Sequence, residues 1–75
     1  MADHELDLRG LNCPIPVMRM KKKMLAMASG QTLRVLTTDP GSMPDFKAYV
    51  KSSGDIMLES KKNAEGDFEF LLKRA

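Results

Sequence analysis

Alternating polar and apolar residues mark the strands of this chain. The pattern predicts strands over residues 4–9, 31–37, 55–61 and 67–73, the last two joined by a hairpin turn at 63–66. In three of them the alternation also assigns one face to a hydrophobic core. The residues expected to face that core are Leu6, Leu8, Ile56, Leu58, Phe68, Phe70 and Leu72.

Two other segments follow the helical period, in which apolar residues recur at steps of three and four. The first covers residues 14–28, with Pro14 in its first turn and Gly30 as its C-terminal cap. The second begins with a capping box, in which Asp45 stands three residues after a Ser42 cap, and runs to about Ser53. The helical residues expected to be buried are Val17, Met20, Met24, Met27, Met43, Phe46 and Val50, with Tyr49 on the flank.

The predicted order is β-α-β-α-β-β, which defines an α+β fold. The most economical arrangement is a two-layer sandwich, a four-stranded mixed sheet with both helices on one face. The chain has 75 residues, enough for one hydrophobic core, so we expect residues 1–75 to form a single domain. No apolar run is long enough to span a membrane and the N-terminus does not resemble a signal peptide, so a cytoplasmic location is expected.

Composition narrows the possible chemistry. One cysteine and one histidine exclude an internal disulfide and a Cys/His zinc cluster, and we expect no metal and no other cofactor. A net charge of +2 is too small to indicate nucleic-acid binding by itself. In so small a domain, a reactive side chain is expected at the surface, and Cys13 is the candidate.

Cys13 precedes the first predicted helix in the segment Asn12-Cys13-Pro14-Ile15-Pro16. Free N–H groups and the dipole at a helix N-terminus stabilise a thiolate, which lowers the pKa of a cysteine there. Pro14 and Pro16 have no N–H, so we expect only a modest lowering of the pKa, together with a stiff backbone. Ile15 is expected to project an apolar side chain beside the sulfur. The alternative is that Cys13 is a buried, unreactive core residue.

The same segment carries a resemblance to a known family. Leu6-Asp7 followed by Gly10-Leu11-Asn12-Cys13-Pro14-Ile15-Pro16 resembles the CPxP signature of TusA/SirA-type sulfur carrier proteins, and the likeness continues in order along nearly the whole chain. The resemblance implies the sandwich fold and a persulfide on Cys13, loaded by a cysteine desulfurase and passed to a downstream acceptor protein. In the best-known branch the sulfur reaches the wobble uridine of tRNA; others serve sulfur oxidation or molybdenum-cofactor chemistry. Such a protein is a persulfide-transferring carrier rather than a stand-alone enzyme.

The resemblance also implies partner-facing positions. Asp45 occupies the family's acidic position at the start of the second helix, which implies a place near Cys13 and at a partner surface, and its alternative role is that of a capping residue. Met18 and Lys21 match partner-facing positions of the first helix, and Arg9 is a further candidate on the loop side. Two departures are visible: Ile15 stands where many members have a polar residue, and Gly54-Asp55 replaces a common Gly-His pair.

Two other functions remain open at this stage. The basic run from Arg19 to Lys23 suits a non-catalytic RNA- or protein-binding module, although direct nucleic-acid binding is not expected because few aromatic residues are available for stacking. A single reactive cysteine also suits a redox sensor, with any resolving thiol supplied from elsewhere. A carrier that docks alternately on two partners is expected to act as a monomer.

Overall fold

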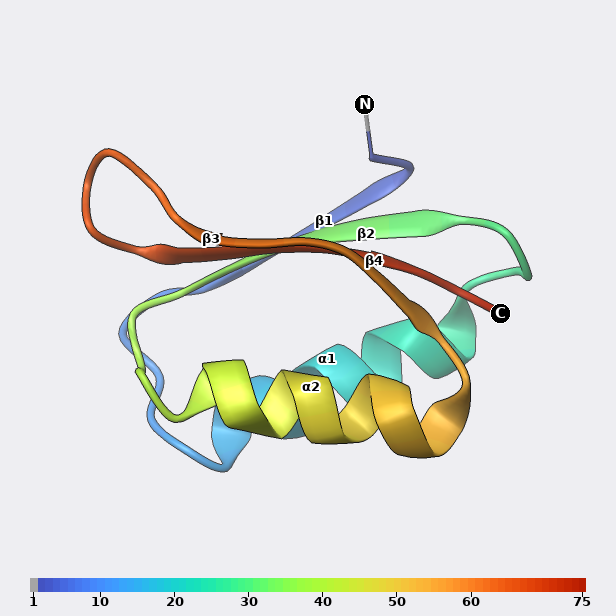
Figure 1. The fold of residues 1–75 in the computed structure, drawn as a ribbon, viewed down its shortest axis with the longest axis horizontal. Helices are drawn as coiled ribbons and strands as arrows, with labels where there is room; N and C mark the ends of the chain where they lie inside the picture. The colour runs from blue at the N-terminus through green and yellow to red at the C-terminus, as the bar shows by residue number, and fades with distance from the viewer. Residues whose placement is uncertain (1) are drawn as a thin grey trace.

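The computed structural model describes residues 2–75 as a four-stranded sheet with both helices packed on one face (Figure 1), as the sequence predicts. The elements, in chain order, are β1 (His4–Leu8), α1 (Ile15–Ala26), β2 (Thr32–Thr37), α2 (Ser42–Ser53), β3 (Ile56–Lys62) and β4 (Phe68–Lys73). Neither helix in this part of the chain combines the length and apolar character needed to cross a membrane.

The strand order in the sheet is β1-β2-β4-β3. Strands β1 and β2 are parallel, so α1 serves as the crossover between them, while β4 is antiparallel to both β2 and β3. The register aligns Leu6 with Val35 and Val35 with Phe70. Apolar residues of neighbouring strands therefore lie side by side on the face that the helices cover.

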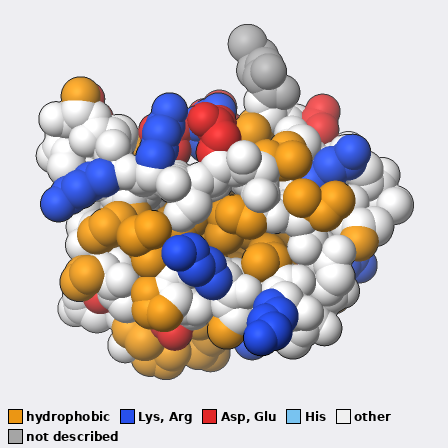
Figure 2. Space-filling view, viewed as in Figure 1, with side chains coloured by type: hydrophobic (Ala, Val, Ile, Leu, Met, Phe, Trp, Pro, Cys, Tyr) orange, Lys and Arg blue, Asp and Glu red, His pale blue; other side chains and the backbone are white. Residues whose placement is uncertain are grey.

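The core lies between this sheet face and the two helices. The Phe46 ring of α2 packs against the Phe70 ring of β4, with centroids 4.6 Å apart and planes tilted by 44°. Along the edge seen in Figure 2, hydrophobic side chains fill the seam between the sheet and α2, and lysine and arginine side chains flank them. The buried hydrophobic residues are Leu8, Met20, Met24, Met27, Leu33, Val35, Phe46, Tyr49, Phe70 and Leu72.

Most of the predicted core is confirmed, and Leu6, Val17, Met43, Val50 and Phe68 pack against it while partly buried. Tyr49, by contrast, is a core residue and not the flanking residue that the sequence predicts. Its hydroxyl is satisfied inside the protein, as described below, so a ring with a polar tip can be buried there.

The predicted inward face of β3 is wrong. Ile56 and Leu58 are 47% and 48% exposed, and Met57 is the residue that packs against the core. The register between β3 and β4 shifts between Met57 and Glu59, which leaves Leu58 as the extra residue of a bulge. Since one extra residue reverses which positions face inward, a simple alternation cannot describe this strand.

Three predicted helix boundaries also change. Helix α1 begins at Ile15, with Pro14 as its N-cap, and ends with Met27 as its C-cap, so Gly30 belongs to the turn before β2. Gly41 is the N-cap of α2, and no side chain caps this helix, so the predicted capping box does not form. The Ser42 hydroxyl is buried against the sheet, and Asp45 contacts Cys13.

A buried carboxylate, Asp55, ties α2 to the C-terminal end of the chain. It accepts hydrogen bonds from the Tyr49 hydroxyl at 2.7 Å and from the Ala75 N–H at 2.9 Å, and the Arg74 guanidinium lies 3.7 Å away. Burial raises the pKa of Asp55, but these hydrogen bonds and the Arg74 charge outweigh it, so the pKa is lowered overall. The ionised carboxylate therefore stabilises the folded state.

Asp55→Asn is expected to lower the free energy of unfolding by about 1–3 kcal/mol at neutral pH, because buried donors lose a charged acceptor. The effect should be present above the ordinary carboxyl pKa of about 4 and should fade as pH falls through the lower folded-state value. Urea unfolding at neutral pH and well below pH 4 measures the loss of stability, with Glu65→Gln at an exposed position as the control. If Asp55→Asn loses as much free energy of unfolding well below pH 4 as at neutral pH, the ionised Asp55 carboxylate is not the source of the stability.

Candidate functional site

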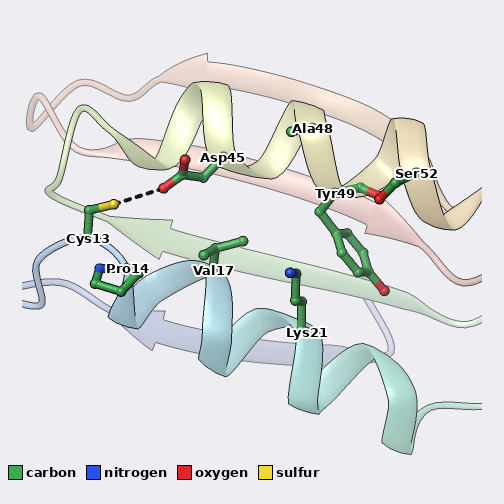
Figure 3. Close-up of a pocket in the computed structure, with 8 residues that line it drawn as sticks. All are labelled: Cys13, Pro14, Val17, Lys21, Asp45, Ala48, Tyr49 and Ser52. Carbon is green, nitrogen blue, oxygen red and sulfur yellow. Dashed lines mark hydrogen bonds between the residues drawn. The ribbon is translucent and has the colours of Figure 1, made fainter.

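Cys13 lies in the loop between β1 and α1, two residues before the helix begins, and its side chain is exposed. The Cys13–Pro14 peptide bond is cis. In Figure 3 the sulfur points across to the first turn of α2. The alternative of a buried core cysteine is therefore wrong.

Two carboxylates from one segment hold Cys13 in place. The thiol donates a hydrogen bond to Asp45 Oδ2 at 3.0 Å, and the Cys13 backbone N–H donates to Asp39 Oδ2 at 2.8 Å. Asp39 lies in the loop between β2 and α2, and Asp45 lies in the first turn of α2. The start of α2 thus fixes both the backbone and the sulfur of the cysteine.

Two buried hydroxyl groups support the loop between β2 and α2. Thr37 and Ser42 are both buried, and their hydroxyl oxygens are 2.6 Å apart. Ser42 donates to the Asp39 carbonyl oxygen at 2.6 Å, which leaves the Thr37 hydroxyl to donate to Ser42. A Cβ on Gly41 would lie 3.3 Å from Asp39 Oδ2 and 3.6 Å from Cys13 Cβ, so a larger residue there would displace the Asp39 carboxylate.

The pKa of the Cys13 thiol is raised, not lowered as the sequence predicts. The main cause is the hydrogen bond to Asp45, followed by partial desolvation and by the negative charges of Asp45 and Asp39. The helix provides little compensation because the Ile15 N–H is already bonded to the Asn12 carbonyl at 2.9 Å, and Pro14 and Pro16 have no N–H. Asp45 therefore accepts a hydrogen bond from the thiol and stabilises its protonated form.

A groove of about 300 Å³ runs from the thiol between the two helices. Lys21 of α1 lines it together with Tyr49 of α2, and the Lys21 ammonium lies 5.9 Å from the centroid of the Tyr49 ring. Figure 3 shows these side chains further along the same groove as Cys13. The lining residues are Cys13, Pro14, Val17, Lys21, Asp45, Ala48, Tyr49 and Ser52.

The exposed face of α1 carries a second hollow beside the site. Ile15 and Met18, which are 38% and 57% exposed, line it with the basic side chains of Arg19 and Lys22. Pro16, in contrast, is fully buried and anchors the start of the helix. An apolar surface with a basic border therefore lies on the first turns of the helix that follows Cys13.

Arg9 does not join the groove. Its guanidinium bonds to Asp7 at 2.8 Å and lies 3.5 Å from Asp67, so it is held at the end of the sheet. The hydrogen bond from Arg9 lowers the pKa of Asp7 to about 2. Arg9 is thus engaged in local ion pairs with Asp7 and Asp67.

Sequence reasoning found Cys13 and Asp45 but missed how they are supported. In the sequence, Asp39 begins an Asp-Pro-Gly stretch that is typical of a turn, and Ser42 was expected only as a helix cap. Neither pattern indicates that the Asp39 carboxylate binds the cysteine backbone, because that contact joins residues 26 positions apart.

The outer face of the sheet does not favour RNA stacking. The two phenylalanines of β4, Phe68 and Phe70, pack on the core side. On the outer side Arg34 is paired with Glu69 and lies 3.8 Å from Glu59. Since stacking platforms need exposed aromatic rings, these strands offer a face of paired charges in place of a base-binding surface.

A two-layer sandwich that presents one thiol at the junction of two helices belongs to a known structural class. The crystal structure of a SirA-like protein from Desulfitobacterium hafniense has the same fold, with a TM-score of 0.84 and 25% sequence identity over 93% of this chain and 95% of that one. The family model described as sulfurtransferase TusA matches residues 4–74. This chain belongs to the TusA family, whose general role is that of a sulfur carrier between donor and acceptor proteins.

Similar proteins agree with this assignment. The sulfur carrier protein TusA of Allochromatium vinosum is 52% identical over 73 residues, which cover 97% of this chain and 95% of that protein. A putative sulfur carrier protein of Bacillus subtilis is 46% identical over 66 residues, covering 88% of this chain and 85% of its own length. These similarities extend over most of the chain, so they include the Cys13 segment and the start of α2.

Proposed function

We propose that this protein carries sulfane sulfur as a persulfide on Cys13, accepting it from a cysteine desulfurase and delivering it to a downstream acceptor protein. The observation that carries the proposal is the exposed thiol, displayed at one end of an open groove in a chain of the TusA family. The chain is expected to act as a monomer, since each partner must reach the same thiol in turn.

The transfer needs no change in the overall oxidation state. The Cys13 thiolate attacks the outer sulfur of the donor's persulfide, a new S–S bond forms on Cys13, and the donor's S–S bond breaks. The donor cysteine leaves as a thiolate and takes up a proton, so the Cys13 proton is balanced. In the delivery step the acceptor's thiolate attacks the outer sulfur of the Cys13 persulfide, and Cys13 is the leaving group.

The final acceptor is proposed to lie in a relay for tRNA 2-thiolation, with a cytoplasmic setting. Support comes from the paired charges on the outer sheet face, which fit a carrier that hands sulfur to a protein and does not bind tRNA directly. Sulfur oxidation and cofactor synthesis are the competing acceptors. Mixing the loaded carrier with purified acceptors of each kind and following the labelled sulfur distinguishes them.

Loading is tested with a cysteine desulfurase, pyridoxal phosphate and labelled cysteine, followed by intact-mass measurement. The expected product gains one sulfur atom per chain, and a thiol reductant removes it. Peptide mapping should place the label on Cys13. If no reductant-labile sulfur is gained under conditions in which the desulfurase turns over, the proposed function is wrong.

The docking surface is proposed to be the exposed face of α1, with Lys21 and Asp45 at its inner border. Its apolar centre, Ile15 and Met18, is bordered by Arg19 and Lys22, which suits a partner whose active-site rim is acidic. Electrostatic steering of this kind changes association rates by roughly 10- to 1000-fold at low salt.

Arg19→Glu/Lys22→Glu is therefore expected to slow desulfurase-dependent loading by about tenfold or more at low ionic strength, and less at high salt. The matched control is Lys47→Glu/Lys51→Glu, the same charge change on exposed positions of α2. Loading rates at several salt concentrations measure both. Equal slowing in the two variants would show a general charge effect and would remove the α1 face as the docking surface.

A further inference from the structure

The contact between Cys13 and Asp45 is unusual for a thiol that must act as a nucleophile. Asp45 Oδ2 lies 3.0 Å from the sulfur and accepts a hydrogen bond from the thiol, and Asp39 places a second carboxylate at the Cys13 backbone N–H. On the α1 side, the charged group that lines the groove is Lys21, whose ammonium lies over the Tyr49 ring. The charges closest to the sulfur are therefore negative.

This arrangement favours the thiol over the thiolate. A carboxylate that accepts the S–H hydrogen bond stabilises the protonated sulfur, while a thiolate in the same place would face two like charges. Because the thiolate is the form that attacks sulfur or carbon electrophiles, the bond to Asp45 restrains reactivity. The raised pKa of Cys13 agrees with this preference for the thiol over the thiolate.

We propose that Asp45 is a positioning residue that holds the Cys13 sulfur neutral and directed toward the first turn of α2 in the free carrier, and that a partner which engages the Asp45 carboxylate releases the thiolate. This rests on the proposed function, because it describes how the Cys13 thiol of the unloaded carrier is protected until it meets a sulfur donor. Electrophiles in solution encounter Cys13 as a protonated thiol, which reacts slowly. A docking partner that neutralises Asp45 encounters Cys13 as the reactive thiolate.

The test is the rate of Cys13 alkylation by iodoacetamide as a function of pH, for the wild type and three variants. In the wild type the midpoint should lie above the value of about 8.5 for an unperturbed cysteine. Asp45→Asn should move the midpoint to lower pH. A midpoint lower by about one pH unit should raise the rate near pH 7 by about three- to fourfold, because the tenfold gain in thiolate is partly offset by weaker nucleophilicity.

Two matched variants separate charge from position. Asp45→Glu keeps the carboxylate and should retain a midpoint above that of Asp45→Asn. Glu65→Gln makes the same change in net charge in the β3–β4 turn and should leave the midpoint unchanged. Thermal melting checks that each variant is folded.

A wild-type midpoint below that of a free cysteine, or an unchanged or higher midpoint in Asp45→Asn, would overturn the proposal. Alkylation requires no sulfur donor, so this result is independent of loading. If the midpoint moves as expected but no sulfur is loaded, the proposed function fails while the restraint stands. If loading succeeds and the midpoint does not move, only the restraint fails.

Discussion

Replacing Phe46 with alanine is expected to cost about 3–5 kcal/mol of the free energy of unfolding, the usual range for a buried phenylalanine. Phe46 is fully buried, and its ring packs 4.6 Å from that of Phe70, centroid to centroid. The two rings join α2 to the strand that pairs with both β2 and β3. Their contact thus connects the helix layer to the middle of the sheet.

This loss is large for so small a domain. At roughly 0.05–0.15 kcal/mol per residue, a chain of 75 residues has a stability of about 4–11 kcal/mol. Phe46→Ala should therefore lower the urea midpoint strongly and leave a marginally folded protein. Urea unfolding followed by circular dichroism measures it. The control is Leu25→Ala on α1, where the side chain is 70% exposed and the change should stay within about 0.5 kcal/mol.

The same substitution should also reach the site, because Phe46 directly follows Asp45. Burial of the Phe46 ring sets the rotation of the first turn of α2, and this rotation directs the Asp45 carboxylate toward Cys13. A loss of stability below about 1 kcal/mol would contradict the assignment of Phe46 to the centre of the core. Phe46 thus supports the stability of the fold, and the adjacent Asp45 supports the geometry at the Cys13 sulfur.

Periodicity was sufficient to predict the architecture and most of the core. Met20 and Met24 of α1 and Met27, its C-cap, are buried as expected, because helical spacing determines which side of a helix meets the sheet. The same reasoning failed for strand β3. Its bulge at Leu58 is defined only by how β3 pairs with β4, and the alternation of residues within β3 does not show that one of them is unpaired.

The site was predictable in its central residue but not in its electrostatics. A cysteine before a proline-flanked helix start indicated Cys13, and the structure places it at the surface. The predicted direction of its pKa was wrong because it took account only of the helix that follows in sequence. The controlling groups, Asp39 and Asp45, come from the β2–α2 loop and the first turn of α2, and only the tertiary fold brings them to Cys13.

Cys13→Ser is expected to abolish sulfur loading while leaving the fold intact. The side chain is exposed, so the thermal melting temperature should change by no more than a surface substitution usually causes. A serine hydroxyl can still donate to Asp45, which preserves the local geometry. Oxygen cannot replace sulfur in the reaction, because the hydroxyl remains protonated and cannot form the S–S bond on which the sulfur is carried.

The measurement is intact mass after incubation with desulfurase and labelled cysteine, with Asn12→Ala as a matched exposed substitution in the same loop. Asn12→Ala should still gain a reductant-labile sulfur, since the Asn12 contact to Ile15 uses its backbone carbonyl. Cys13→Ser should gain none. An equal gain in Cys13→Ser would mean that the sulfur is bound without a persulfide at this residue. The groove, and not the thiol, would then be the feature that holds the cargo.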